Sequence, residues 1–545
     1  MLSLLGVAFA VAVAAASASP VPTASATPGS GVTCGTSSTE QSFATPAPVD
    51  GLTVDDIVAK SCRAAGDDKP VASEIALWKL HYAGLDGTMR NTHLGEDFVS
   101  TQQFDTYVNS SGSSGGKRWR QNENGEVIVL PSEPPDPDVA TVSESLKRVT
   151  SPVDAYEVET VAANGSSNRS FYDPKTFLVV RSERTAFAVK SYRVYEDFVT
   201  DSAGRTFARH IHGGDQRPNN DWDDLLISDD LTAPVSERDV AIPANRRVLV
   251  EFPAGRKTVR LPARIVRGAI IVRVQIGERG VDFLLDSGAS EIVLDRAVAE
   301  ELGLKVVGQH TATNAGDLAS ASARVPEMKI GDLTLHDVAI DILPWAENVE
   351  LGTKASGILG FDFFDGAAIT IDYAKGTVDA TAPAAFVPEP GAVEIPAHLT
   401  YWGVPQAALT IGPTKGDHFI IDTGAQLHSI VIFQHFVRLN ARKIPAAVKN
   451  GNVGWSTDMV GGKVNHFPIV VHGITFGGWR IDELHGELAH SPPAFDSIDG
   501  LLGSGFLELF RFTIDEPHAK LYFIPVEDEA TPAPVPSPAP SDARR

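Results

Sequence analysis

The C-terminal half of the chain contains one pattern of residues twice, and an internal repeat strongly restricts the folds that a chain can adopt. The first copy reads Phe-Leu-Leu-Asp-Ser-Gly-Ala around Asp286, and the second reads Phe-Ile-Ile-Asp-Thr-Gly-Ala around Asp422. In both copies a turn containing glycine and an apolar stretch lead into the aspartate. The repeat therefore predicts two similar units built of β-strands, the first over residues 265–395 and the second over residues 396–527.

A second pair of motifs follows the two copies. Gly-Ile-Leu-Gly ends at Gly360 and Gly-Leu-Leu-Gly ends at Gly503, and the tripeptide Thr-Ile-Asp comes after each of them. Ordinary residue frequencies give about 0.3 chance occurrences of a single Asp-Ser/Thr-Gly motif in a chain of this length. Two such motifs at matched places in a longer pattern are not explained by chance.

The repeated motif suggests how the two aspartates are used. Each one ends an apolar strand and enters a turn in which Gly288 or Gly424 accepts a backbone conformation that other residues resist. The strand that ends in Gly360 or Gly503 is expected to pack beside that turn. If an approximate two-fold axis relates the units, the carboxyl groups face each other and keep one proton between them. Such a pair can activate a water and polarise a carbonyl, which is the chemistry of peptide hydrolysis.

These motifs resemble those of aspartic proteases of the retropepsin and pepsin clan, in the single-chain, two-lobed bacterial form. The resemblance covers residues 265–527 and implies a mainly β fold, a polypeptide substrate, no cofactor and no metal. Because both lobes are fused, it also implies a monomer. Asp286 and Asp422 would be catalytic, and the hydroxyls of Ser287 and Thr423 would bond to the opposite lobe. The residues expected to support the pair are Ser287, Gly288, Thr423, Gly424, Gly360 and Gly503.

Two features bear on how such a site would work. The segments Thr311–Ala323 and Val453–Asn465 contain glycine and are candidates for hairpins that cover the substrate, with ordinary surface loops as the alternative. Ala289 and Ala425 stand where pepsin-like enzymes more often have Ser or Thr. Because a hydroxyl there would stabilise the charged carboxylate, its absence predicts a pH optimum of about 5–6 rather than one near 2.

Residues 51–245 predict a different domain that is also rich in β-strands. Thr53 is a suitable N-cap for a short helix that begins at Val54. The later pattern, with Trp119 before a turn and the phrase Tyr-Asp-Pro-Lys-Thr after Phe171, resembles the half-barrel of periplasmic lipoprotein carriers. That likeness implies an apolar concave face for a lipid, a lipoprotein or a peptide, whereas an ordinary β-domain that spaces or inhibits the rest is the alternative. Strands are expected at 126–130, 155–162, 176–181 and 192–199.

Two pairs of histidines lie outside the main motifs. His210 and His212 would face the same side of a strand, so a metal pair is conceivable, but ordinary surface histidines are the favoured interpretation because no third ligand is evident. His418 and His428 flank the second aspartate box. They are interpreted as plain polar residues, with an influence on the titration of the aspartates as the alternative.

The N-terminal end of the chain is typical of exported proteins. Residues 1–18 form an apolar run that ends in Ala-Ser-Ala, which predicts a cleaved signal peptide and a periplasmic or extracellular protein, with an uncleaved membrane anchor as the alternative. Residues 19–50 are rich in Pro, Ala, Ser and Thr, and predict a flexible leader. After export, Cys34 and Cys62 could form a disulfide, or they could remain two separate thiols.

Composition limits the possible partners. The chain has 46 Lys and Arg against 69 Asp and Glu, a net charge of −23, which argues against binding to nucleic acid. Residues 246–264 are interpreted as a linker, and residues 528–545 as a disordered tail rich in Pro and Ala.

The sequence therefore favours an exported aspartic endopeptidase with a β-rich N-terminal domain. The main alternative is a catalytically silent protein that binds peptide, lipid or lipoprotein. A third hypothesis treats residues 19–245 as an inhibitory pro-segment that is cut in the basic stretch Ala244–Lys257.

Overall fold

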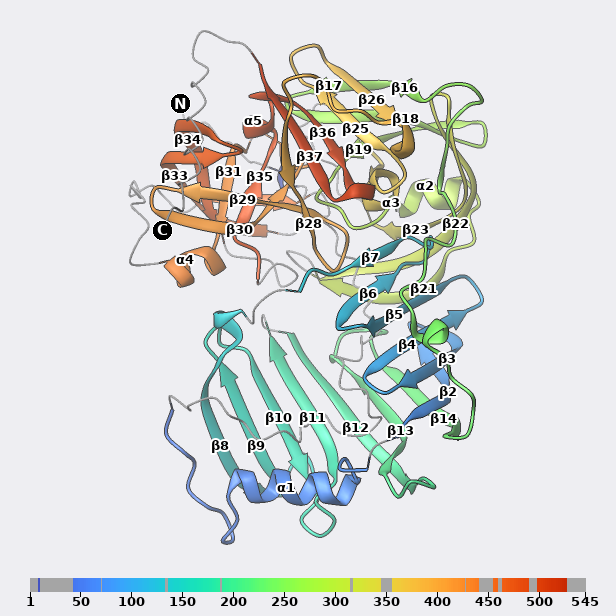
Figure 1. Ribbon diagram of the computed structural model, residues 1–545, viewed down its shortest axis with the longest axis vertical. Helices are drawn as coiled ribbons and strands as arrows, with labels where there is room; N and C mark the ends of the chain where they lie inside the picture. The colour runs from blue at the N-terminus through green and yellow to red at the C-terminus, as the bar shows by residue number, and fades with distance from the viewer. Residues whose placement is uncertain are drawn as a thin grey trace, which may run out of the picture.

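The computed structural model describes most of the chain. Within the described residues the protein is mainly β, and a curved N-terminal sheet precedes two further lobes (Figure 1). This arrangement confirms the predicted fold class. None of the described helices is long and apolar enough to cross a membrane. The described residues are 8–9, 43–69, 71–132, 136–186, 189–313, 317–344, 355–426, 428–440, 454–458, 463–489 and 497–526.

The N-terminal domain is one antiparallel sheet of 13 strands in the order β7-β6-β5-β4-β3-β2-β14-β13-β12-β11-β10-β9-β8. The chain runs outward from the centre of this sheet through β2–β7, continues at the opposite edge with β8, and returns to the centre, where β14 pairs with β2. The strands are β2 Ser73–Tyr82, β3 Leu85–Leu94, β4 Asp97–Phe104, β5 Val108–Ser114, β6 Lys117–Gln121, β7 Val127–Val129, β8 Thr141–Val149, β9 Ala155–Ala162, β10 Ser167–Tyr172, β11 Val179–Ala186, β12 Val189–Thr200, β13 Thr206–Gly214 and β14 Trp222–Asp230.

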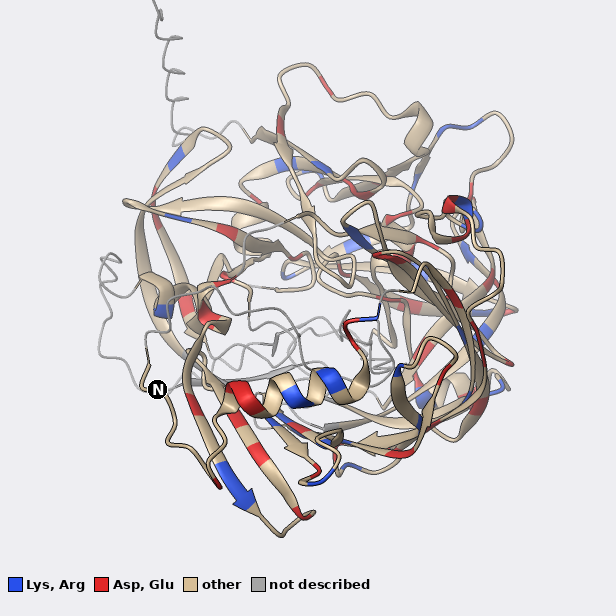
Figure 2. Cartoon of the chain, turned by 60° about the horizontal axis from the view of Figure 1, so that its bottom comes forward, with Lys and Arg blue, Asp and Glu red and all other residues tan. Residues whose placement is uncertain are grey.

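Helix α1, Val54–Ala65, lies across the curved sheet, with its acidic residues in the first turn and its basic residues toward the end (Figure 2). It begins at the predicted residue because Thr53 and Asp56 form a capping box that satisfies backbone N–H groups. It ends at Gly66, whose φ of 73° is a left-handed conformation that glycine adopts easily. Ile57 is fully buried against the sheet. Cys62 in this helix is disulfide-bonded, and Cys34, the other cysteine of the chain, lies outside the described residues.

The two lobes contain related sheets. The first has the order β15-β23-β20-β24-β19-β18-β22-β21, with β17 paired to β18, and the second has the order β1-β32-β33-β34-β31-β35-β30-β29-β28. The strands of the first are β15 Val250–Glu251, β17 Ala263–Val266, β18 Ala269–Ile276, β19 Arg279–Leu285, β20 Val293–Asp295, β21 Val307–Thr313, β22 Asp317–Ile330, β23 Leu333–Leu343 and β24 Gly357–Leu359. Those of the second are β1 Ala8–Phe9, β28 His398–Leu399, β29 Pro405–Ile411, β30 Thr414–Ile421, β31 Ile430–Phe433, β32 Gly454–Asp458, β33 Lys463–Phe476, β34 Trp479–Ala489 and β35 Gly500–Leu502.

A third sheet, with the order β16-β26-β25-β36-β37-β27, joins the lobes. Here the two Thr-Ile-Asp tripeptides meet, because β25 and β36 pair antiparallel with Thr370 opposite Thr513. The two threonine hydroxyls are 2.8 Å apart and hydrogen-bonded. One hydrophobic cluster runs through both lobes, whereas the N-terminal domain has clusters of its own. The strands are β16 Thr258–Arg260, β25 Ala368–Asp372, β26 Thr377–Thr381, β27 Val393–Pro396, β36 Phe510–Asp515 and β37 Lys520–Pro525.

Short helices close several connections. The α-helices are α2 Arg296–Glu301, α3 Phe361–Phe364, α4 Gln434–Asn440 and α5 Ser504–Leu507, and the 3-10 helices are η1 Pro137–Val139, η2 Glu237–Val240, η4 Pro383–Ala385 and η6 Glu516–His518. The segment 246–264, predicted as a linker, is instead folded into the first lobe. It contributes β15, which pairs with β23, and β16, which pairs with β26.

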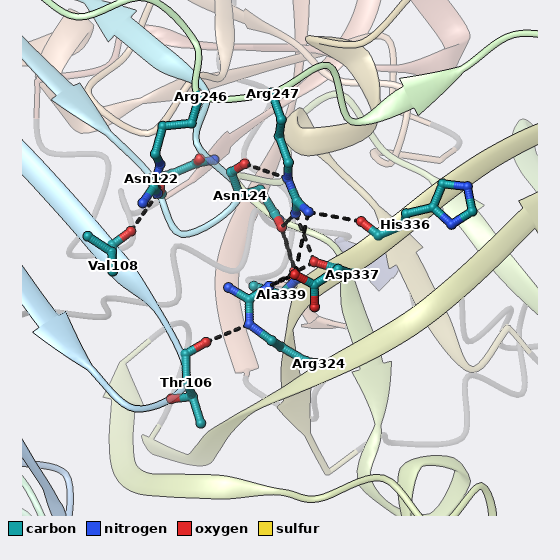
Figure 3. Close-up of polar contacts among 10 residues, drawn as sticks. All are labelled: Thr106, Val108, Asn122, Asn124, Arg246, Arg247, Arg324, His336, Asp337 and Ala339. Carbon is teal, nitrogen blue, oxygen red and sulfur yellow. Dashed lines mark hydrogen bonds and ion pairs between the residues drawn. The ribbon is translucent and has the colours of Figure 1, made fainter.

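Polar groups dock the N-terminal domain onto the first lobe (Figure 3). The side chain of Asn124 donates to the carbonyl oxygen of Ala339 and accepts from its N–H, both at 2.9 Å. The guanidinium of Arg247 donates to Asn124 and to the carbonyl oxygens of His336 and Asp337. The basic stretch that was considered as a cleavage site therefore takes part in the junction between the domains.

Candidate active site

Both aspartate boxes lie where a strand ends beside the strand of the downstream glycine motif. Asp286 follows β19, which runs parallel to β24, and Asp422 follows β30, which runs parallel to β35. The N–H of Asp286 donates to the carbonyl oxygen of Leu359, and the N–H of Asp422 donates to that of Leu502, both at 3.0 Å. The repeated motifs thus produce the same local structure in both lobes.

The glycines of the two boxes leave space for the opposite carboxyl. A Cβ atom at Gly288 would lie 2.7 Å from Cγ of Asp422, and a Cβ atom at Gly424 would lie 2.3 Å from Cγ of Asp286. The backbone N–H of each glycine donates to Oδ1 of its own aspartate, at 2.9 Å in the first lobe and 2.8 Å in the second. The structure therefore brings the two aspartates face to face across the lobe junction.

The hydroxyl groups of Ser287 and Thr423 tie the two turns together. Oγ of Ser287 donates to the carbonyl oxygen of Ile421 at 2.7 Å and accepts from the N–H of Thr423 at 3.1 Å. In return, Oγ1 of Thr423 donates to the carbonyl oxygen of Leu285 at 2.9 Å and accepts from the N–H of Ser287 at 3.0 Å. All four bonds are buried, so the two boxes are positioned relative to each other as one unit.

Gly360 and Gly503 lie directly against the aspartate turns. A Cβ atom at Gly360 would be 2.3 Å from the carbonyl oxygen of Glu291, and one at Gly503 would be 2.5 Å from that of Ala425. A side chain at either position would push the turn away, because a backbone atom at that distance cannot give way cheaply. These glycines set the distance between the aspartate turn and the short helix that follows, α3 or α5.

The electrostatic environment favours a shared proton. Asp286 is 0% and Asp422 is 2% exposed. Burial raises the pKa of Asp286 well above its ordinary value, and the nearby charge of Asp422 raises it further. Burial also raises the pKa of Asp422, to about 7, although hydrogen bonds from Asp286 and from the N–H groups of Ala425 and Gly424 oppose the shift. The pair can therefore hold one proton as an acid and one charge as a base at a higher pH than isolated aspartates could.

Hairpins occupy both segments that were predicted as covers. The strands β21 and β22 form the first hairpin, and β32 and β33 form the second. Residues 314–316 and 459–462, which come between these strands in the sequence, lie outside the described residues. The first hairpin is attached to the N-terminal domain, because the side chain of Asn220 accepts from the N–H of Thr311 and donates to its carbonyl oxygen.

The four histidines contact other side chains. Nε2 of His210 bonds to Asp223 at 2.7 Å, and the rings of His210 and His212 lie 5.3 Å apart on one strand. Among the described residues, no group of three or more His, Cys, Asp or Glu side chains could hold a metal ion. His428 is buried with Nδ1 3.5 Å from Glu487, and the ring of His418 contacts Gln406.

Sequence reasoning missed the buried carboxyl groups that lie behind the first box. Asp362, the second residue of α3, accepts hydrogen bonds from the N–H of Ile292 at 3.0 Å and from the side chain of Asn122 at 2.8 Å. Glu291 and Asp341 are buried nearby, and burial raises the pKa of both. The one signal in the sequence is an acidic residue directly after a strongly apolar motif, Ile-Leu-Gly-Phe.

Comparisons with known proteins find matches to parts of the chain. The aspartyl protease family matches residues 272–363, which include the first box and Gly360 but not Asp422. No curated protein matches the chain. The structure of Basic 7S globulin from soybean is similar at 13% identity with a TM-score of 0.29, over 49% of this chain and 94% of that chain.

Two further solved structures match about a third of the chain. A DUF1329 family protein from Desulfovibrio piger has 12% identity and a TM-score of 0.25, over 33% of this chain and 94% of that chain. A domain described as an outer membrane lipoprotein-sorting protein from Vibrio parahaemolyticus has 9% identity and a TM-score of 0.26, over the same shares of the two chains.

Proposed function

We propose that the protein is an exported aspartic endopeptidase whose catalytic residues are Asp286 and Asp422. The observation that carries this proposal is the pair itself: two buried carboxyls that face each other, each at the end of the same strand-and-turn motif. The match of residues 272–363 to the aspartyl protease family supports it. The four hydrogen bonds of Ser287 and Thr423 support it as well, because a catalytic pair needs a fixed geometry.

The reaction would proceed by general acid and base catalysis. The ionised carboxyl takes a proton from a water, and the water oxygen forms a bond to the carbonyl carbon of the scissile peptide. At the same time the protonated carboxyl donates to the carbonyl oxygen, which gives a tetrahedral diol. The peptide nitrogen then receives a proton from the pair, and the bond between carbon and nitrogen breaks. As the diol becomes a carboxylic acid, one of its hydroxyl groups gives its proton back to the pair, which returns to its starting protonation state.

Substitution of either aspartate tests this mechanism directly. Asp286→Asn and Asp422→Asn should each lower kcat for a mixed peptide library by at least about 10²–10⁴-fold, the contribution of a general acid or base. Asp332→Asn and Asp482→Asn are matched controls, because these aspartates are 54% and 88% exposed on the two lobes. Circular dichroism should show that all four variants fold. A near-normal rate in Asp286→Asn or Asp422→Asn would overturn the assignment.

The proposal includes export and a monomeric state. Expression of the full chain in a secreting host should give a product that begins at residue 19, as determined by N-terminal sequencing. Light scattering should give the mass of one chain, because one chain supplies both aspartates. Activity of the intact chain would count against the pro-segment hypothesis. A folded wild type that cleaves no peptide at any pH would instead favour the binding-protein alternative.

A further inference from the structure

A pocket of about 950 Å³ lies between the N-terminal domain and the second lobe, beside the first aspartate box. Its volume is at the upper end of the range for ligand pockets, about 300–1,000 Å³. Ser290, four residues after Asp286, lines it from the first lobe, and Trp402 and Ile498 line it from the second lobe. Arg118 and Leu130 line it from the N-terminal domain. Three parts of the chain that are far apart in sequence therefore meet around one space.

The strand β6 holds the N-terminal wall of this pocket in place. Arg118 and Arg120 are two residues apart on β6 and so share a face. The guanidinium of Arg120 is 5.3 Å from the ring centroid of Tyr401 and 4.7 Å from that of Trp402. Arg120 is only 6% exposed, and such a desolvated contact between a cation and aromatic rings is stronger than one in water. The domain is thus anchored where the pocket lies.

Most of the charged groups that line the pocket have partners of opposite charge among the described residues. Asp136 and Asp499 both bond to His435, at 3.1 Å and 2.9 Å, and Asp417 pairs with Lys415. Arg118 is exposed, and its side chain has no partner among the described residues. The rest of the lining combines apolar and aromatic side chains, such as Leu130 and Trp402, with uncharged polar ones. The lining therefore suits an apolar segment that carries a carboxylate.

We propose that the N-terminal domain forms one wall of the substrate cleft and that this pocket selects the substrate. It binds the residues on one side of the scissile bond, prefers large apolar side chains, and places an acidic side chain opposite Arg118. This inference rests on the proposed function, because the pocket is read as part of the cleft through Ser290. The domain then determines specificity and is more than a spacer.

Charge reversal at Arg118 tests the inference in the full chain. Peptides that vary one position at a time around the scissile bond should be cleaved about fivefold better with Glu than with Lys at one position, the effect of an exposed ion pair. Arg118→Glu should reverse that preference in kcat/KM at the same position. Lys117→Glu is the matched control, because Lys117 is exposed on the opposite face of β6. An unchanged preference in Arg118→Glu would overturn the proposal.

A second pair of variants tests the apolar part of the lining. Leu130→Glu places a charge in the pocket and should lower kcat/KM for peptides rich in Phe and Leu by about tenfold, the cost of leaving an apolar contact unmade. Val129→Glu is the control, because Val129 is 43% exposed and points away from its neighbour Leu130. Equal effects of the two substitutions would contradict a role of the pocket in binding.

A binding measurement separates this inference from the proposed function. Fluorescence anisotropy can follow a fluorescein-labelled peptide rich in Phe and Leu that carries one Glu, and its Lys counterpart, on the full-length Asp286→Asn variant. The Glu peptide should bind more tightly, and Arg118→Glu in the same chain should remove the difference. If wild type cleaves nothing but this difference is seen, the proposed function fails and the pocket stands. If cleavage occurs but Arg118→Glu changes neither binding nor preference, the pocket fails alone.

Discussion

Gly288 and Gly424 determine how closely the carboxyls of Asp286 and Asp422 approach each other. Neither glycine is needed for a left-handed backbone, because neither has a positive φ. Each is needed because the opposite carboxyl occupies the space that a methyl group would take. The sequence identifies these glycines through the repeat, but it suggests a different reason, the conformation of the turn. The close approach across the lobe junction is visible only in the tertiary structure.

Replacement of Gly424 by alanine should therefore lower the catalytic activity more than the stability of the fold. The new methyl group would lie 2.3–2.4 Å from the carboxyl atoms of Asp286 and would displace them. We expect kcat to fall by about 100-fold, as for a misplacement of reacting groups by about 1 Å. Gly277→Ala is a useful control, because its φ of 58° gives strain without a nearby clash. That variant should lose about 1 kcal/mol of stability and keep its activity. If Gly424→Ala keeps its activity and Gly277→Ala loses it, Gly424 does not determine how the two carboxyls approach each other.

The pH dependence of the rate should also be determined by Asp286 and Asp422. Both pKa values are raised by burial, so the singly protonated pair persists to higher pH than ordinary aspartates would allow. The acid limb of the pH–rate profile should lie above the ordinary aspartate pKa of 3.8, and the optimum should lie above about pH 5. The measurement is kcat on a neutral peptide from pH 2 to 9. A maximum below pH 3 would contradict the upward shifts.

At the scale of elements, the repeat acts through paired strands. The short strands β24 and β35 each run parallel to the strand that carries an aspartate, and β25 and β36 join the lobes through the two Thr-Ile-Asp tripeptides. The sequence shows where these motifs begin, because an apolar run that ends in glycine can be recognised from neighbouring residues alone. Strand bounds in the N-terminal domain are less regular: β9 matches the prediction of 155–162, whereas β11 begins at Val179 rather than at 176. The Tyr172–Leu178 connection folds as a turn, where Asp173 accepts from the N–H groups of Lys175 and Thr176.

The bonds between the two aspartate turns predict a stability effect. Thr423→Val removes the hydroxyl that joins Leu285 and Ser287 and leaves a buried N–H and a buried carbonyl unpaired. We expect a loss of about 1–3 kcal/mol in the free energy of unfolding, measured by urea denaturation. Thr423→Ser keeps the hydroxyl and should lose less than half as much. If Thr423→Val loses no more than Thr423→Ser, which keeps both hydrogen bonds, these bonds do not explain the stability of the two turns.

At the scale of the whole molecule, the N-terminal domain has its own apolar clusters and docks through buried polar groups. Asn122 and Asn124 reach the first lobe, and carboxyl groups with raised pKa values are buried at this junction. The charge of Asp362 adds to burial in raising the pKa of Glu126, and burial raises the pKa of Asp341 to about 7. Such a junction is sensitive to pH in a way that a purely apolar one would not be.

Stability should therefore decrease as the pH rises from about 4 to 7. In this window the folded chain keeps protons on Asp341 and Asp362 that the unfolded chain has lost, because their folded pKa values are about 7 and about 6 against 3.8. Each such carboxyl contributes a slope of up to about 1.4 kcal/mol per pH unit. Urea denaturation at several pH values measures this change in the free energy of unfolding with pH, and Asp341→Asn should flatten the slope. A stability that increases with pH across this window would contradict the assigned burial.

The amino-acid sequence predicted the mainly β fold correctly, and it identified the two aspartates and the glycines around them as candidates for one site. These features occur twice in the chain. A local pattern of strands, turns and glycines that occurs twice can be recognised in the sequence before the contacts of those residues are known. Only the tertiary structure decided the surroundings of the pair. It showed that residues 246–264 belong to the first lobe, that Arg120 lies over the ring of Trp402 beside a pocket, and that buried carboxyls lie at the domain junction. Such contacts join residues more than a hundred positions apart, and no local pattern records which distant surfaces will pack together.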